Sequence, residues 1–338
     1  MDFFKFDGEV WRRLLELLQY DSSAPLTLAS GFFLFAFLVF GIGYMAVRNR
    51  RAARTIYVAA ISLYFYYKIS GLFVLLLLFV ATSDFLIGNR VAKRRSEGRS
   101  TRAWVVLSMI INILILAYFK VGGLFETAIN NLCGNGTLNL GEILVPAGVS
   151  FFVFQSMSYI IDISRGVINP VKRYLDYLFL LSFFPKVFLG PLVRNKEFIP
   201  QIESERITVT RDDLGRAVSL IASGLIKYAV ISKAIDTLLL IPAVAGEFGD
   251  SGVVMLAALL AFGIRLYCDF SGYSDMAIGI ALALGYKLPD NFDAPFKSAT
   301  ITEFWRRWHI SLSTWLRDYL YISLGGNRKG RIRTYMNL

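Results

Sequence analysis

The sequence is poor in charged residues, in cysteine and in histidine. Asp, Glu, Lys and Arg make up 18% of its 338 residues, against about 25% in a typical soluble domain. The two cysteines, Cys133 and Cys268, lie far apart and form no CxxC pair, which excludes a disulfide framework or a zinc cluster. There is one histidine, His309. With 55% hydrophobic residues, these shortages argue against a water-soluble globular fold.

The net charge of +11 lies largely in short basic segments between apolar runs. A nucleic-acid-binding protein spreads basic side chains over a folded surface, whereas a membrane protein confines them to loops on its cytoplasmic side. The second pattern is found here. We therefore expect membrane lipid around the chain and no nucleic-acid partner.

The first apolar segment runs without a charge from Leu26 to Val47. A helix needs about 20 apolar residues to cross about 30 Å of hydrocarbon, so this segment predicts a membrane span. The basic residues 48–54 follow it directly. Because positively charged loops stay in the cytoplasm, residues 1–25 are predicted to be an extracytoplasmic N-terminal segment. Acidic residues outnumber basic ones there, unlike in a signal peptide.

Further uncharged runs predict an all-α, polytopic transmembrane protein with about eight or nine membrane segments. Residues 174–193 contain Pro185 and the pair Gly190-Pro191, which predicts a broken or re-entrant helix that lines protein or water. No linker or fixed repeat occurs, so residues 1–338 are interpreted as a single integral membrane domain. The other predicted segments are 55–67 and 69–83 as a hairpin, 103–119, 143–161, 214–241, 252–268, 276–286 and 301–324.

Charged side chains inside apolar segments are costly in a membrane, so each one suggests a function. Lys186, Arg265, Asp269 and Asp275 stand out. Arg265 and Asp269 are spaced i,i+4 and should share a helix face as an ion pair. The alternative is that such pairs only hold helices together. Gly272, between the two aspartates, favours a bend or a close helix contact.

The most informative segment runs from Thr300 to Leu320. Thr300 with Glu303 fits a capping box, which predicts a helix that begins there. Winding it at about 100° per residue places His309 inside the apolar face, near its edge. The apolar face comprises Phe304, Trp305, Trp308, Leu312, Trp315, Leu316, Tyr319 and Leu320, and the opposite face comprises Arg306, Arg307, Ser313, Arg317 and Asp318.

His309 can be interpreted in two ways. A histidine on an apolar helix face is usually a core residue whose hydrogen bonds are satisfied. A catalytic role is favoured by the surrounding aromatic residues, which would exclude water, and by neighbouring arginines suited to a phosphate or thioester-carrier group. The glycine-rich residues 324–331 are too loose for a phosphate loop and predict a cytoplasmic turn; a contact to an anionic donor is the alternative there.

Longer motifs with specific sequences occur from residue 146 to residue 328. They are residues 146–162 and 183–194, Cys268-Asp-Phe-Ser-Gly-Tyr-Ser-Asp275, Asn291-Phe, Glu303-Phe-Trp-Arg-Arg-Trp-His-Ile-Ser311, Trp315-Leu-Arg-Asp-Tyr-Leu-Tyr321 and Gly325-Gly-Asn-Arg328. Together they resemble the membrane-bound O-acyltransferase family, nearest its bacterial branch typified by the alginate O-acetyltransferase membrane subunit. The teichoic acid D-alanyl transfer protein is a more distant relative in this resemblance, which is strong over 145–338 and weak upstream.

The resemblance implies transfer of an acyl group, commonly acetyl, through a funnel of helices in the bacterial plasma membrane. The donor would be a cytoplasmic acyl-CoA or acyl-carrier thioester, used as a substrate with no bound cofactor and no metal. The acceptor would be an extracytoplasmic alginate, another exopolysaccharide, peptidoglycan or a teichoic acid. Periplasmic or extracellular proteins similar to acetyltransferases or esterases are the expected partners.

In the same resemblance, His309 matches the first of two family histidines, the one in the Trp-His-Ile-Ser motif. The second lies further along, in a Trp-His-Gly motif, and is credited with the main catalytic role. Because the 338 residues contain no second histidine, a C-terminally truncated chain is expected.

An acyl transfer to a hydroxyl needs a base and a group that stabilises the oxyanion. We expect His309 to orient or polarise substrate with the help of Trp305, Trp308 and Arg307. Asp269, Ser271 and Asp275 would act from a neighbouring helix as hydrogen-bond partners. Two other functions compete with this one. The first is an ion or solute transporter or channel built on Lys186, Arg265, Asp269 and Asp275. The second is a non-catalytic membrane scaffold for a partner acyltransferase.

Overall fold

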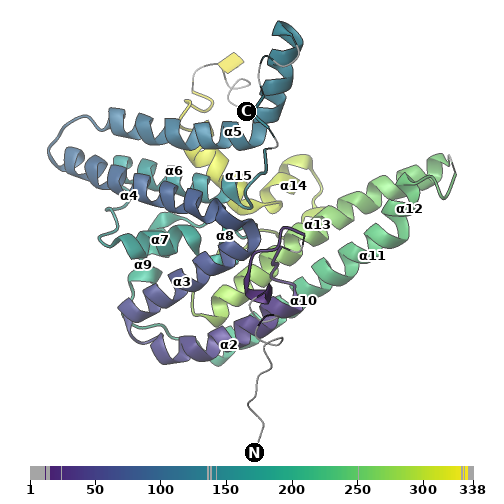
Figure 1. Cartoon of the computed structure of the whole chain (residues 1–338), viewed down its shortest axis with the longest axis horizontal. Coiled ribbons are helices and arrows are strands. Elements are labelled where there is room, and N and C mark those ends of the chain that lie inside the picture. The colour runs from purple at the N-terminus through teal and green to yellow at the C-terminus, as the bar shows by residue number, and fades with distance from the viewer. Residues whose placement is uncertain are drawn as a thin grey trace, which may run out of the picture.

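The structure is a computed structural model that describes residues 12, 16–23, 25–134, 137, 139–141, 143–249, 251–328, 330 and 332–333. Over these residues helices follow one another and no strand occurs, which confirms the predicted all-α class. Figure 1 shows a body of packed helices and a long two-helix arm that projects from it. The predicted extracytoplasmic segment 1–25 lies mostly outside the described residues.

The first half of the body contains four long helices. The chain turns between α3 and α4 at Gly71, whose φ of +57° favours glycine, and the two helices run in opposite senses in Figure 1. This is the turn predicted between residues 55–67 and 69–83. The elements are α2 (Gly31–Val47), α3 (Arg51–Ser70), the short 3₁₀ helix η1 (Gly71–Phe73), α4 (Val74–Ser96) and α5 (Arg102–Cys133).

A buried carboxylate ties two of these helices, α4 and α5, to a third helix that follows them. Asp84 on α4 is fully buried and accepts hydrogen bonds from Ser108 Oγ and Asn112 Nδ2 of α5, both at 2.7 Å. It also accepts from Ser156 Oγ at 2.6 Å. Ser156 belongs to α6 (Val149–Arg165), which packs against both α4 and α5. Three donors on one carboxylate offset much of the cost of burying it.

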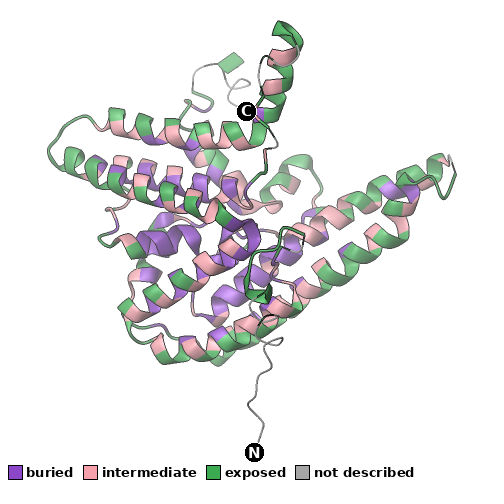
Figure 2. Ribbon diagram, viewed as in Figure 1, coloured by how far each residue is buried: buried purple, intermediate pink, exposed green. Residues whose placement is uncertain are grey.

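The centre of the body is made of short helices, as predicted for residues 174–193. They are α7 (Tyr174–Ser182), α8 (Phe184–Val187) and α9 (Asn195–Glu203). Nearly all of α7 and α8 is buried, so this broken segment lines protein (Figure 2). Gly190 is required after α8 because a Cβ there would lie 2.4 Å from Lys186 Cα.

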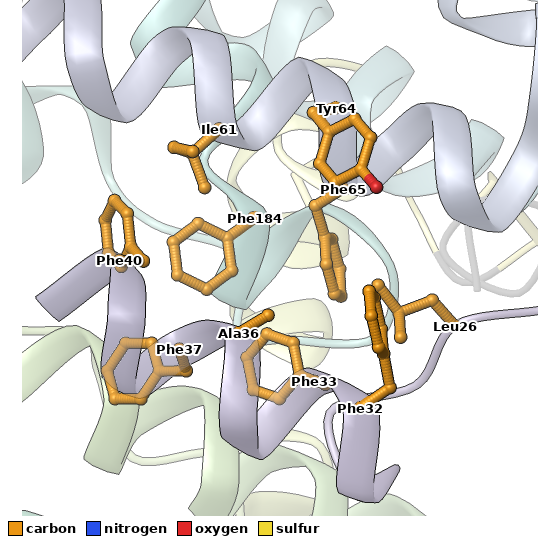
Figure 3. A pocket seen from close by; sticks show the side chains of 10 residues that line it. All are labelled: Leu26, Phe32, Phe33, Ala36, Phe37, Phe40, Ile61, Tyr64, Phe65 and Phe184. Carbon is orange, nitrogen blue, oxygen red and sulfur yellow. The ribbon is translucent and has the colours of Figure 1, made fainter. Parts of the chain in front are cut away.

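An aromatic cavity of about 90 Å³ lies where α8 meets α2 and α3 (Figure 3). Phe184 of α8 stands edge-on to Phe40 of α2, with ring centroids 5.6 Å apart, and also contacts Phe65 of α3 at 5.5 Å. Edge-to-face contacts of this kind add to the stabilisation from burial alone. They fix the position of α8 and hence of the chain that follows it.

The arm is a pair of long helical stretches. Its first side consists of α10 (Arg211–Leu225), the π-helical turns η2 (Ile226–Ser232) and η3 (Asp236–Leu240), and the short helices α11 (Lys233–Ile235) and α12 (Ile241–Val244). Its second side is α13 (Gly252–Ala283). The prediction of separate segments at 252–268 and 276–286 is wrong, because one helix covers the first segment and continues through the second as far as Ala283.

Gly272 explains that difference. A Cβ on Gly272 would lie 2.8 Å from the backbone oxygen of Gly224, and one on Gly224 would lie 2.5 Å from the oxygen of Gly272. Glycine therefore serves here for close contact between α10 and α13, one of the two predicted possibilities, and not for a bend.

Four stretches of described helix are long and apolar enough to cross a membrane, namely Arg51–Ser96, Arg102–Cys133, Arg211–Val244 and Gly252–Ala283; Gly31–Val47 is a shorter apolar helix. These stretches support a multi-pass membrane protein. They are fewer than the predicted segments, because α6 has 17 residues, α7 has 9, and Arg51–Ser96 contains both α3 and α4, on either side of the turn at Gly71.

Candidate active site

The segment around His309 is not the single helix that the sequence predicts. Thr300 Oγ1 caps α14 (Ile301–Arg307) by accepting from Glu303 N at 3.1 Å, as expected. The helix then ends, Trp308 is extended, and His309 is left-handed, with φ +43° and ψ +53°. Helical structure resumes in α15 (Ile310–Trp315) and the π-helical turn η5 (Leu316–Tyr321).

The helix ends because a second segment takes over its hydrogen bonds. Asp293 N donates to Arg307 O at 3.0 Å, and Ile310 N donates to Asn291 O at 2.9 Å. Trp308 and His309 lie between these two bonds. A left-handed backbone costs an L-residue other than glycine about 1–2 kcal/mol, so the break is imposed by the surrounding structure and not by local preference.

His309 is surrounded by phenyl rings from three different segments. Its ring centroid lies 6.4 Å from Phe151 of α6, 6.3 Å from Phe270 of α13 and 6.2 Å from Phe292, which is nearly parallel to it. The Nε2 atom is buried and has no hydrogen-bond partner within the described part of the chain. An imidazole nitrogen of this kind keeps the capacity to form one hydrogen bond.

The sequence predicts aromatic residues around His309 but does not identify these three. Phe151, Phe270 and Phe292 come from distant parts of the chain, and only folding brings them together. Phe151 also lines a cavity of about 270 Å³ at the start of α6. The other residues lining this cavity are Lys120, Val145, Pro146, Ala147, Gly148, Val149, Ser150, Phe188 and Leu189.

Trp308 belongs to an aromatic cluster beside His309. Its ring stacks on Phe304 at 5.3 Å and meets Phe292 edge-on at 5.2 Å, so Phe292 contacts both Trp308 and His309. Trp305 is 56% exposed and contacts Phe304. Arg307 forms an ion pair with Glu303 at 2.7 Å. The contacts described for Trp305 and Arg307 do not include His309.

The acidic candidates lie on α13 and face the first helical stretch of the arm. Asp275 pairs with Lys227 of η2 at 2.6 Å, and Ser271 Oγ accepts from the same lysine at 3.0 Å. The predicted pair of Arg265 and Asp269 is present at 3.2 Å. Among described contacts, Asp269, Ser271 and Asp275 accept hydrogen bonds from residues of the arm, and His309 is not one of their partners.

Lys227 and two further partners in this cluster were not predicted. Asp236 of η3 is 3.1 Å from Arg265, and Ser232 Oγ donates to Asp269 at 2.5 Å. Their polar side chains recur along residues 227–236, but the π-helical turns η2 and η3 interrupt the α-helix there, so an α-helical wheel misplaces these side chains. Lys186 lies elsewhere, buried in α8.

The segment after His309 is anchored to α6. Trp315 Nε1 donates to Phe154 O at 3.1 Å, and the Tyr319 hydroxyl donates to the Asp162 carboxylate at 2.9 Å. Arg194 pairs with Asp318 at 2.6 Å. These contacts fix the position of α15 and η5, the helical segment that follows His309. A contact between residues 324–331 and an anionic acyl donor is one of the predictions. Lys329 and Arg331 of this stretch lie outside the described residues.

Comparison with known proteins identifies the family to which the chain belongs. The model of the membrane-bound O-acyltransferase family matches residues 165–338, and the chain belongs to that family. It is 37% identical to the probable alginate O-acetylase AlgI of Pseudomonas aeruginosa over 93% of the chain and 60% of that protein. It is 30% identical to the peptidoglycan O-acetyltransferase of Helicobacter pylori over 90% of the chain and 63% of that protein.

A third relative lies further away. The teichoic acid D-alanyltransferase of Bacillus subtilis is 30% identical over 52% of the chain and 44% of its own length. The chain thus spans about 60% of the length of the alginate and peptidoglycan relatives. The resemblance expected from the sequence motifs is confirmed.

Proposed function

We propose that the protein is an O-acyltransferase of the bacterial plasma membrane, with its N-terminus extracytoplasmic. It would move an acyl group, most simply acetyl, from a cytoplasmic thioester donor to a hydroxyl of an extracytoplasmic polysaccharide. One observation carries the proposal: the buried Nε2 of His309 has no partner in the described part of the chain and lies within a ring of phenyl groups. Membership in the family supports it.

In the proposed reaction, the hydroxyl oxygen attacks the thioester carbonyl, a C–O bond forms and the C–S bond breaks. The hydroxyl proton passes to a base and then to the departing thiolate. His309 would hold the hydroxyl or the carbonyl in line for attack, because its free nitrogen can accept or donate one hydrogen bond. The resemblance gives the base role to a second histidine in a Trp-His-Gly motif, which these 338 residues do not contain.

The two substrates would reach His309 from opposite sides. The cavity beside Phe151 follows the loop predicted to be extracytoplasmic, so we assign it to the acceptor. The names of the relatives point to alginate, peptidoglycan or teichoic acid as acceptor classes. Acyl-CoA or an acyl carrier would supply the thioester, and extracytoplasmic proteins similar to acetyltransferases or esterases would be partners.

The charged cluster in the arm favours a helix-holding role over a transport path. Lys227 has Asp275 as its counter-ion, and Arg265 has both Asp236 and Asp269. Each cation of the cluster is therefore paired. Such pairs offset the cost of placing charges in apolar segments and link α13 to the first stretch of the arm.

The test is the ester content of the cell envelope. Base-labile acetate is measured on isolated polysaccharide from bacteria that carry the gene, lack it, or carry it on a plasmid. The proposal predicts loss of acetate on deletion and recovery on complementation. Equal acetate in all three strains would contradict it.

A further inference from the structure

The left-handed turn at His309 is held by the buried residue Asn291. Asn291 is 2% exposed and lies between α13 and the short helix η4 (Pro295–Lys297). Its backbone oxygen accepts from Ile310 N at 2.9 Å. Its side-chain oxygen accepts from Ser311 N at 3.2 Å and from Ser311 Oγ at 2.9 Å. Three hydrogen bonds from the two residues after His309 therefore end on Asn291.

Two further bonds anchor this cluster to the body. Asn291 Nδ2 donates to Ser274 Oγ of α13 at 3.2 Å. Ser311 Oγ accepts from Leu192 N, in the segment that follows α8, at 3.0 Å. Asn291, Ser274, Ser311 and Leu192 are all buried. The turn is thus tied to two separate elements through polar atoms that would be costly to leave unpaired.

We propose that Asn291 is a positioning residue for His309. A left-handed residue other than glycine persists only where its surroundings hold it. Asn291 holds the two residues that follow His309, so it sets the direction in which the imidazole leaves the backbone, toward Phe151, Phe270 and Phe292. The effect on acyl transfer rests on the proposed function, whereas the effect on imidazole geometry does not.

The geometry can be measured without any substrate. Isotope-labelled histidine gives an imidazole signal for His309 in detergent micelles, and this signal is identified as the one that His309→Ala removes. Asn291→Leu removes the side-chain acceptor and donor, and should shift and broaden that signal. Asn291→Asp keeps an oxygen to accept from Ser311, and Ser274 can donate in place of accepting, so its signal should stay close to that of the wild type.

The matched control is Asn112→Leu. Asn112 is also buried and hydrogen-bonded, but it belongs to the Asp84 cluster between α4 and α5. It should lower thermal stability and leave the His309 signal in place. If Asn291→Leu fails to fold, Ser311→Ala, which loses one of the three bonds to Asn291, should give a smaller shift. The proposal is overturned if the His309 signal does not move in Asn291→Leu, or in Ser311→Ala when Asn291→Leu does not fold. It is also overturned if Asn112→Leu shifts the His309 signal as much as Asn291→Leu does.

Acyl transfer supplies the second readout. Displacing a reacting group by about 1 Å can cost about 100-fold in rate, so Asn291→Leu should lower polysaccharide acetylation by roughly tenfold to 100-fold. Asn291→Asp should restore most of it. A shifted imidazole signal, with no ester formed even by the wild type, would uphold the positioning role and reject the proposed function. Normal acetylation by Asn291→Leu despite the shift would reject the catalytic consequence.

Discussion

At the residue scale, the backbone of His309 determines what its imidazole can contact. A helix through residues 304–320 would leave His309 at the edge of an apolar face, whereas the left-handed turn directs it among Phe151, Phe270 and Phe292. The sequence predicts the capped start of this helix from Thr300 and Glu303, which are close together. It does not predict the break, because the cause lies in Asn291 and Asp293, which are remote in sequence.

Strain at His309 leads to an unusual order of stabilities. Glycine tolerates positive φ, so the free energy of unfolding of His309→Gly should exceed that of His309→Ala by about 1 kcal/mol. His309→Gly should therefore unfold at a higher temperature. At Ser313, inside α15, the order should reverse, with Gly less stable than Ala by about 1 kcal/mol. Thermal unfolding of the four variants in detergent measures both differences. The same order at both positions would show that His309 carries no strain.

At the element scale, the arm depends on how closely α10 approaches α13. The sequence indicated that Gly272 lies at a bend or a close contact, and its flanking charges predicted the pair of Arg265 and Asp269. Long-range packing determines which helix lies opposite Gly272. Together with the π-helical turns, it brings Lys227 and Asp236 into the charged cluster. Helical periodicity alone carries neither piece of information.

The close contact predicts different effects for two glycines of α13. Gly272→Ala adds a Cβ 2.8 Å from Gly224 O and 2.9 Å from Tyr228 N, and should destabilise the protein by about 1–3 kcal/mol. Gly263→Ala meets no atom within 4 Å and should be neutral or stabilise by up to about 1 kcal/mol. Thermal unfolding in detergent compares them. If Gly272→Ala leaves the unfolding temperature unchanged, α10 and α13 are further apart than these distances indicate.

At the scale of the whole molecule, composition and apolar runs predict a multi-pass helical membrane protein. Proline and glycine also predict that the segment 174–193 is broken, and the structure confirms this. The number of segments was harder to predict, because a short apolar run in the centre of the body resembles a short span. Exposed apolar residues on the arm, such as Leu238, Val244 and Val253, fit contact with lipid.

The predicted orientation can be tested with the native cysteines. Cys133 is exposed at the end of α5, in the region predicted to be extracytoplasmic, and Cys268 is buried. A membrane-impermeant maleimide should label Cys133 in intact cells and leave Cys268 unlabelled. In a Cys133→Ser background, Arg50→Cys should react only after lysis, because residues 48–54 are predicted to be cytoplasmic. Labelling of Arg50→Cys in intact cells would reverse the orientation.

The central claim is that His309 serves acyl transfer. The most direct measurement is base-labile acetate on envelope polysaccharide from a deletion strain that carries the wild-type protein, His309→Ala or Ser219→Ala. Ser219 is exposed on α10 and serves as the control. At equal amounts of protein in the membrane, His309→Ala should reduce acetate by about 100-fold or more, and Ser219→Ala should match the wild type. Wild-type acetylation by His309→Ala would contradict the account.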